Sequence, residues 1–104
     1  MNLGLQDKTA LVLGGGGGLG SAIAQALAAE GAKIAIGDID PAAVERSAQA
    51  IKSKTPALGL VWDLADLGVI DKNVSAIEKG LGPVDILVNI TGGPPPTPAA
   101  GQPA

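Results

Sequence analysis

The sequence predicts an α/β domain in which helices cover both faces of a parallel β-sheet. Four short apolar segments alternate with three helix-forming segments, beginning and ending with an apolar one. The apolar segments contain continuous runs of aliphatic residues, which is typical of strands buried on both faces. Right-handed crossovers between such strands then favour the order 3-2-1-4. The expected architecture is a sheet of about four strands.

The first two strands are expected at 9–13 and 33–38, on either side of a helix. The first strand, Thr-Ala-Leu-Val-Leu, runs directly into a glycine-rich segment, Gly14 to Gly18. Alanine, a strong helix former, dominates the segment after these glycines. The apolar face of the helix repeats every four residues, at Leu19, Ile23 and Leu27. Gly31 stands where a helix is commonly terminated by a residue in the left-handed conformation.

A second helix is expected to begin at Asp40, which can cap it, with Pro41 in the first helical position. Its apolar stripe consists of Val44, Ala48 and Ile51. A third strand is expected at 57–62. It is followed by a third helix that Asp66 can cap, with the stripe Ile70, Val74, Ile77 and Leu81, and then by a fourth strand at 84–90.

The 104 residues are enough for one domain, which we expect to span 1–92. Residues 93–104 are mostly Pro, Gly and Ala and are expected to be an irregular tail. With one Trp, no Tyr and no Phe, the core must consist of aliphatic side chains. The fourth strand would be an uncovered, apolar edge, so pairing with a second copy or with another protein is expected there.

Composition excludes several functional classes. The net charge of −3, without a Lys/Arg cluster, argues against nucleic-acid binding. The absence of Cys and His removes thiolate chemistry, disulfides and the commonest metal ligands. No apolar run approaches the roughly 20 residues of a membrane span. The N-terminus does not have the pattern of a signal peptide. We therefore expect a cytoplasmic protein with no metal site and no membrane association.

A glycine run between a strand and a helix predicts a phosphate-binding loop. Helix N-termini present free N–H groups, and glycines let the backbone approach a pyrophosphate closely. The run fits three fingerprints at once, G-x-G-x-x-G at 15, 17 and 20, G-x-x-x-G-x-G at 14, 18 and 20, and G-x-x-G-x-x-G at 14, 17 and 20. The spacing alone does not choose among them, but each belongs to a Rossmann-type dinucleotide site.

Two other interpretations of the loop are weaker. An ATP-binding P-loop needs Lys-Ser/Thr after its last glycine, whereas Gly20 is followed by Ser21 and the next lysine is Lys33. A flexible linker does not explain the strand before the glycines or the amphipathic helix after them.

Asp38 ends the second strand about twenty residues after the loop, where an acidic side chain hydrogen-bonds the adenosine ribose. Such a carboxylate repels a 2′-phosphate, and no basic residue lies in the loop, so NAD is expected in preference to NADP. The alternative role, capping the next helix, suits Asp40 better.

Asp63 ends the third strand at the same edge, where it could bond the adenine amino group or simply form a turn. Trp62 is expected to be a core residue.

These residues together resemble the short-chain dehydrogenase/reductase family. Leu13 to Gly20 looks like the TGxxxGIG loop of that family, and Asp38, Asp63-Leu64 and 87–92 (Leu-Val-Asn-Ile-Thr-Gly) fall where it carries its ribose acid, adenine-contacting Asp and NNAG segment. The ending 91–96 is similar to the 3-oxoacyl-carrier-protein-reductase-like branch. The resemblance spans residues 8–96.

The resemblance implies roles for particular positions. Gly14, Gly18 and Gly20 would shape the pyrophosphate loop, with a backbone amide from Leu19. Asp63 and Leu64 would face the adenine. Asn89 would steady the fourth strand, and Gly92 would pass near the nicotinamide ribose. Leu13 replaces the loop threonine, and Ile90 and Thr91 replace the second Asn and the Ala of NNAG.

The catalytic Ser, Tyr and Lys of the family come from segments after the fourth strand, and this sequence contains no Tyr. We therefore expect the N-terminal, cofactor-binding part of an oxidoreductase that transfers a hydride between a nicotinamide cofactor and a carbonyl or alcohol, with no catalytic residue of its own. Two alternatives stay open. One is a self-standing nucleotide-binding or interaction module. The other is the nucleotide-binding half of an extended, epimerase-like enzyme, which the 14, 17 and 20 spacing also fits.

Overall fold

The computed structural model of the chain describes residues 4–14, 16–63 and 65–90. Its elements are β1 (Thr9–Leu13), α1 (Gly18–Ala29), β2 (Lys33–Asp38), α2 (Pro41–Lys52), β3 (Ala57–Val61), α3 (Leu67–Gly80) and β4 (Ile86–Asn89). The four strands form one sheet in the order β3-β2-β1-β4, and every neighbouring pair is parallel. The predicted order 3-2-1-4 is thereby confirmed.

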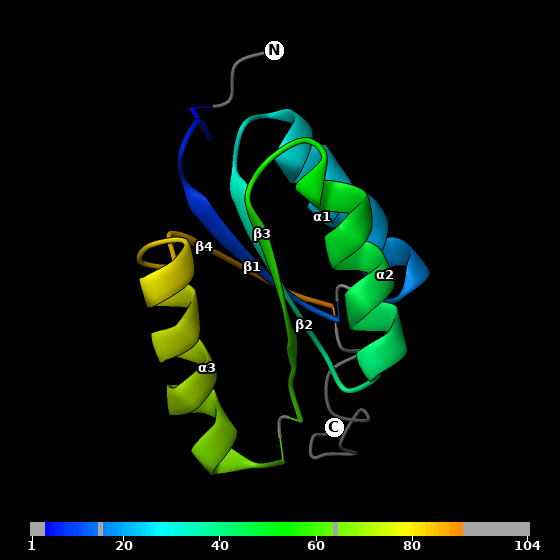
Figure 1. Ribbon diagram of the computed structural model, residues 1–104, viewed down its shortest axis with the longest axis vertical. Coiled ribbons are helices and arrows are strands. Elements are labelled where there is room, and N and C mark those ends of the chain that lie inside the picture. The colour runs from blue at the N-terminus through cyan, green and yellow to red at the C-terminus, as the bar shows by residue number, and fades with distance from the viewer. Residues whose placement is uncertain (1–3, 15, 64, 91–104) are drawn as a thin grey trace, which may run out of the picture.

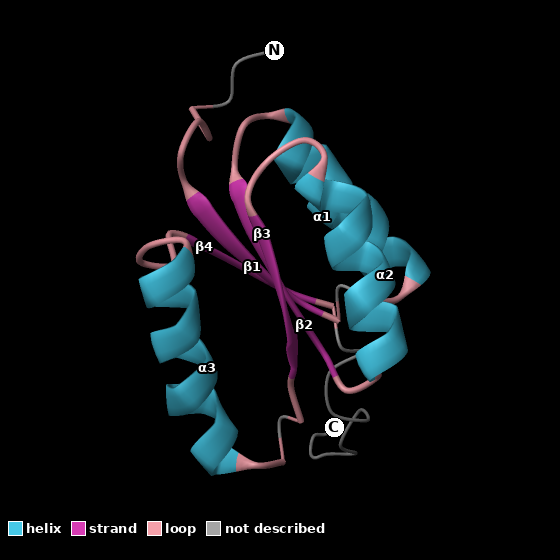
Figure 2. Ribbon diagram, in the orientation of Figure 1, coloured by secondary structure: helices cyan, strands magenta, loops and turns pink. Residues whose placement is uncertain are grey.

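The domain has three layers. Helices α1 and α2 cover one face of the sheet, and α3 lies on the other, as Figure 1 shows. Figure 2 shows the same division by colour, with the strands between the two helical layers. Alternate residues of β1 point into different layers, because successive side chains of a strand face opposite ways. Ala10 and Val12 belong to the core under α1 and α2, whereas Leu11 and Leu13 belong to the core under α3.

Helix ends follow the capping signals of the sequence. Asp40 caps α2 and Asp66 caps α3, each accepting a hydrogen bond at 3.0 Å from the backbone N–H two residues ahead. Gly31, just beyond the end of α1, has φ of 93°, a conformation in which a β-carbon is strained. These short-range signals correctly predicted where α2 and α3 begin and where α1 ends.

The buried face of α1 differs from the predicted one. Its buried residues are Gly20, Ala24 and Ala28, whereas Leu19 is 66% exposed. The predicted apolar face was therefore wrong: the buried residues each follow a predicted one by one position in the sequence. Small side chains allow α1 to approach the sheet closely, so the large ones flank the contact line. Leu27 packs at the border of the core.

The third and fourth strands are shorter than predicted, since Trp62 follows β3 and β4 covers only Ile86–Asn89. In α3, Ile77 and the capping residue Leu81 are buried as expected, but Asn73 is buried with them. Among the described strands β4 pairs only with β1, and its Leu87 is 63% exposed. Among the described residues, no helix is both long and apolar enough to cross a membrane.

Candidate functional site

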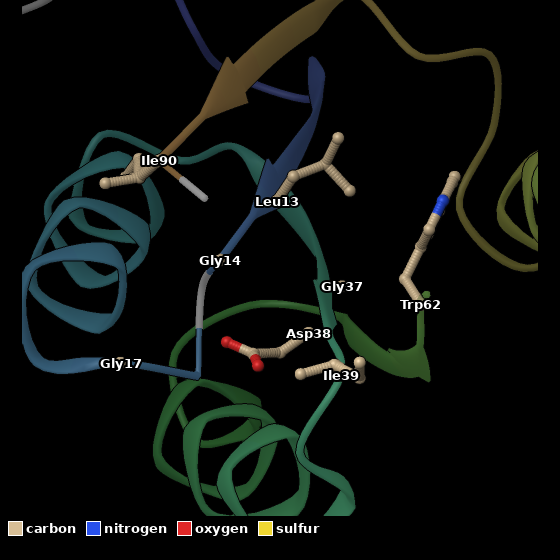
Figure 3. Close-up of a pocket in the computed structure, with 8 residues that line it drawn as sticks. All are labelled: Leu13, Gly14, Gly17, Gly37, Asp38, Ile39, Trp62 and Ile90. Carbon is tan, nitrogen blue, oxygen red and sulfur yellow. The ribbon is translucent and has the colours of Figure 1, made fainter. Parts of the chain in front are cut away.

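The candidate site lies at the carboxyl edge of the sheet. After β1 the chain crosses to β2 on one side, while β4 lies on the other side, so a crevice forms where the two directions diverge. A pocket of about 400 Å³ opens there. Figure 3 shows the residues that line it, which are Leu13, Gly14, Gly17, Gly37, Asp38, Ile39, Trp62 and Ile90.

The turn after β1 depends on Gly14. This residue has φ of 84°, in the left-handed region that glycine adopts without strain. Its N–H donates to the carbonyl of Gly37 at 2.7 Å, and its carbonyl accepts from the N–H of Gly17 at 3.3 Å. Gly17 is the N-cap of α1 and provides no side-chain cap. The first N–H groups of α1 are therefore left to bind water or a ligand, which suits an anion.

Glycines of the loop serve different purposes. A β-carbon on Gly16 would lie 2.7 Å from Cβ of Ala43 and 2.9 Å from Oδ2 of Asp38, so α2 packs directly on the loop at this point. A β-carbon on Gly18 would meet no described atom within 4 Å beyond its chain neighbours and its own helix. The fold thus requires a glycine at position 16 but leaves open space at position 18.

Asp38 connects the end of β2 to the loop. Its Oδ2 accepts a hydrogen bond from the N–H of Gly16 at 3.1 Å, and its Oδ1 accepts from the N–H of Asp40 at 3.2 Å. In Figure 3 the carboxylate points toward the ribbon between Gly14 and Gly17. The cap of α2 is Asp40, as expected, so Asp38 is not used for that purpose. Its carboxylate has a fixed direction at the pocket wall.

Two apolar side chains, Ile39 after β2 and Trp62 after β3, form part of the pocket wall. Ile39 is 64% exposed and lies beside Asp38. Trp62 is 5% exposed and packs in the core under α3, as expected, with its ring close to Gly37. Its Nε1 is buried and has no hydrogen-bond partner among the described residues. An apolar wall with few polar groups is typical of small-molecule sites.

The other predicted site residues differ in their surroundings. Asp63 is exposed, and its Oδ1 accepts from the N–H of Ala65 at 2.9 Å, so the turn alternative describes what its side chain does here. Asn89 ends β4 opposite Leu13 of β1. Leu19 lies exposed in the first turn of α1, and Gly20 is buried in the same turn. Leu64 and Gly92 lie outside the described residues.

Sequence reasoning missed two residues at this edge. Gly16 was one of several interchangeable glycines, and only its contact with α2 distinguishes it. Asn73 stands on the apolar stripe of α3, where a polar residue in a helix could have drawn attention. Its Nδ2 donates to the carbonyl of Val61, at the end of β3, at 3.1 Å. Within the described residues no three His, Cys, Asp or Glu side chains gather into a metal-binding group.

Comparisons with known proteins agree with this geometry. The family model for short chain dehydrogenases matches residues 8–103. Galactitol 2-dehydrogenase of Agrobacterium fabrum is 47% identical over 85 residues, which are 82% of this chain and 32% of that protein. The 2,3-dihydro-2,3-dihydroxybenzoate dehydrogenase of Bacillus subtilis is 37% identical over 90 residues, 86% of this chain and 34% of that protein. The chain thus spans about a third of the length of these relatives.

Solved structures show the same resemblance. NAD⁺-bound xylitol dehydrogenase superposes with a TM-score of 0.76 and 31% identity, over 80% of this chain and 32% of that one. The L-sorbose reductase of Gluconobacter frateurii, complexed with NADPH and L-sorbose, superposes with a TM-score of 0.77 and 30% identity, over 84% of this chain and 34% of that one. The sheet order, the glycine loop and the matched family model lead to one conclusion: the chain belongs to the short chain dehydrogenase family.

Proposed function

We propose that this chain binds the adenosine and pyrophosphate part of NAD(H), as the cofactor-binding portion of an oxidoreductase. One observation carries the proposal. The Asp38 carboxylate and the uncapped N-terminus of α1 lie at the same pocket, joined by the hydrogen bond from Gly16. A carboxylate accepts hydrogen bonds from ribose hydroxyls, and a helix N-terminus attracts phosphate, so the two groups suit adjacent parts of one dinucleotide.

Each predicted site residue has a proposed role. Gly14 and Gly18 give the pyrophosphate access to the backbone, Gly20 keeps α1 close to the sheet, and Leu19 provides a backbone N–H. Asp38 holds the ribose. The remaining proposed contacts, with adenine and with the nicotinamide side, are Asp63, Leu64, Asn89 and Gly92. The cofactor, when bound, would supply or accept the hydride; the residues proposed here bind and orient it.

A preference for NAD over NADP follows from the charge at the ribose position. A 2′-phosphate would lie near the Asp38 carboxylate, and among the described residues no Lys or Arg lines the pocket to compensate its charge. The related structures include one with NAD⁺ and one with NADPH, so membership of the family leaves the choice open. The proposed preference therefore rests on Asp38.

For the whole protein we propose hydride transfer between the nicotinamide cofactor and a carbonyl or alcohol substrate. The names of the relatives favour a sugar alcohol or a cyclic diol. The alternative branch, acting on 3-oxoacyl thioesters, rests only on the resemblance of residues 91–96, which lie outside the described residues. A cytoplasmic location stays a prediction.

Calorimetric titration of the chain with NAD⁺ and NADP⁺ tests the cofactor proposal. We expect NAD⁺ to bind more tightly. Asp38→Asn should weaken NAD⁺ binding by about 10- to 100-fold, because hydrogen bonds to a charged group contribute roughly 1.5–3 kcal/mol. In the same variant, the difference between the affinities for NAD⁺ and for NADP⁺ should be smaller. Asp71→Asn, an equal change of charge at an exposed position of α3, is the matched control and should bind like the unsubstituted chain. Equal or reversed preference in the unsubstituted chain would refute the role given to Asp38.

A second candidate function, association through β4, is supported by the position of that strand. Among the described strands it pairs on one side only, and Leu87 is 63% exposed beside the unpaired edge. Such edges pair readily with other chains. Light scattering over a range of concentrations should therefore show a dimer that Leu87→Lys weakens. A monomer that persists at high concentration would contradict this function.

A further inference from the structure

Asn73 is a polar side chain in an apolar setting. It is 5% exposed and stands on the face of α3 that packs against the sheet, in the same stripe as Ile77. Its neighbours along this face, Ile70 and Val74, pack against the apolar core. Burying an amide costs free energy unless it is hydrogen-bonded, so the partner of this side chain determines what its burial achieves.

The side chain of Asn73 holds one particular peptide group. Its Nδ2 donates to the carbonyl oxygen of Val61 at 3.1 Å. The N–H of that same peptide group belongs to Trp62 and donates to the carbonyl of Asp38 at 2.8 Å. The peptide is thus fixed from both sides, and hydrogen bonds in such a series polarise and strengthen one another. Since Val61 is the last residue of β3, this peptide sets the direction in which the chain leaves the sheet.

The series continues into the pocket. Asp38, whose carbonyl accepts from Trp62, also places its carboxylate on the N–H of Gly16 at 3.1 Å. Trp62 itself lines the pocket. Hydrogen bonds and covalent backbone therefore connect α3, the end of β3, the end of β2 and the glycine loop. Asn73 is the outermost member, on a helix that contributes no side chain to the pocket wall.

We propose that Asn73 is a positioning residue for the nucleotide site. By holding the Val61–Trp62 peptide, it fixes the Trp62 wall and the backbone of Asp38 in the arrangement that receives the adenosine. This inference rests on the proposed nucleotide binding of the same pocket. It assigns to α3 a part in binding, although no described residue of α3 lines the pocket.

The test compares two substitutions that each remove one hydrogen bond from a buried side chain to a backbone carbonyl. Asn73→Leu removes the donor to Val61 and keeps the size of the side chain. Thr9→Val removes the bond from Oγ1 of Thr9 to the carbonyl of Leu81, which measures 3.3 Å and lies at the opposite, amino edge of the sheet. Thr9 is 1% exposed and Asn73 is 5% exposed, so the two substituted side chains are similarly buried, and each donates to a backbone carbonyl. Asn73→Ala serves as a second variant if leucine does not fit the space.

Two measurements are made on chains shown by circular dichroism to be folded. The first is the affinity for NAD⁺ and for AMP. Loss of the positioning bond should weaken both by about 3- to 10-fold in Asn73→Leu, given the net contribution of an ordinary hydrogen bond, and leave Thr9→Val unchanged. The second is the fluorescence of Trp62, the only aromatic residue of the sequence. Its emission should shift in Asn73→Leu and not in Thr9→Val.

The outcomes separate the inference from the function on which it rests. If the unsubstituted chain binds neither NAD⁺ nor AMP, the proposed function fails and the inference falls with it. If the unsubstituted chain binds both and Asn73→Leu binds equally well, only the positioning role is overturned. Equal weakening in Asn73→Leu and Thr9→Val also overturns it, because a general loss of stability would then account for the effect.

Discussion

Substitution of Gly18 by alanine should make the chain more stable and a poorer binder of NAD⁺. Gly18 is the first residue of α1, and a β-carbon there would meet no described atom within 4 Å beyond its neighbours and its own helix. The protein therefore gains from the lower conformational entropy of the unfolded chain without a steric penalty. The same β-carbon would occupy space beside the α1 N-terminus, where we propose that the pyrophosphate lies.

The expected magnitudes follow from these two effects. Replacing glycine by alanine at a compatible position stabilises a protein by about 0.4–1 kcal/mol. For a domain of this size, about 0.5 kcal/mol corresponds to a rise in Tm of roughly 2–4 °C. On the binding side, an added methyl group in a closely packed contact costs roughly 1–3 kcal/mol, so affinity for NAD⁺ should fall by about 5- to 100-fold.

Thermal unfolding and calorimetric titration measure the two effects on the same samples. Gly16→Ala is the contrasting variant, because its β-carbon would approach Cβ of Ala43 to 2.7 Å. It should lower stability by roughly 1–3 kcal/mol, as overpacking does. If Gly18→Ala binds NAD⁺ as tightly as the unsubstituted chain, the pyrophosphate does not lie beside this helix N-terminus. If Gly18→Ala is less stable, the open space inferred at that position is wrong.

Substitutions at three further positions test the fold. Ile77→Ala should destabilise the chain by about 2–5 kcal/mol, because Ile77 is fully buried between α3 and the sheet; urea unfolding measures this, and a loss below 1 kcal/mol would contradict the packing. Asp40→Ala should lower the free energy of unfolding by about 1 kcal/mol through loss of the α2 cap, whereas Asp40→Asn should lower it much less, because asparagine also caps helices. Gly31→Ala should destabilise the chain, because φ of 93° is strained for alanine and the β-carbon would meet Gln6; unchanged stability would argue against this conformation.

Short-range signals in the sequence were sufficient for the elements and their order. The glycine run after β1, the acidic caps Asp40 and Asp66, and the glycine at 31 each act within a few residues, so their meaning does not depend on distant contacts. The continuous aliphatic strands required helices on both faces, and handedness then gave the strand order. For the same reason the sequence alone predicts that Asp38, at the end of β2, lies near the loop.

Packing decided what periodicity could not. Leu19, Ile23 and Leu27 have helical spacing, but the sheet is contacted by Gly20, Ala24 and Ala28. Hydrophobicity alone favours the larger side chains, whereas close approach of a helix to a sheet favours the smaller ones. Strand ends were likewise predicted too long, because apolar residues continue beyond the ends of β3 and β4.

The sequence by itself thus determined the order of elements, the family resemblance and the pair of features, glycine loop and Asp38, that suggest a dinucleotide. Only the tertiary structure distinguished Gly16, which α2 contacts, from Gly18, which faces open space. Only it connected Asn73 on α3 to the end of β3 and thence to Asp38. The physical reason is that capping and strand burial act locally along the chain. Contact between a helix and a loop 27 residues away in sequence, as between Ala43 and Gly16, exists only once the sheet has brought them together.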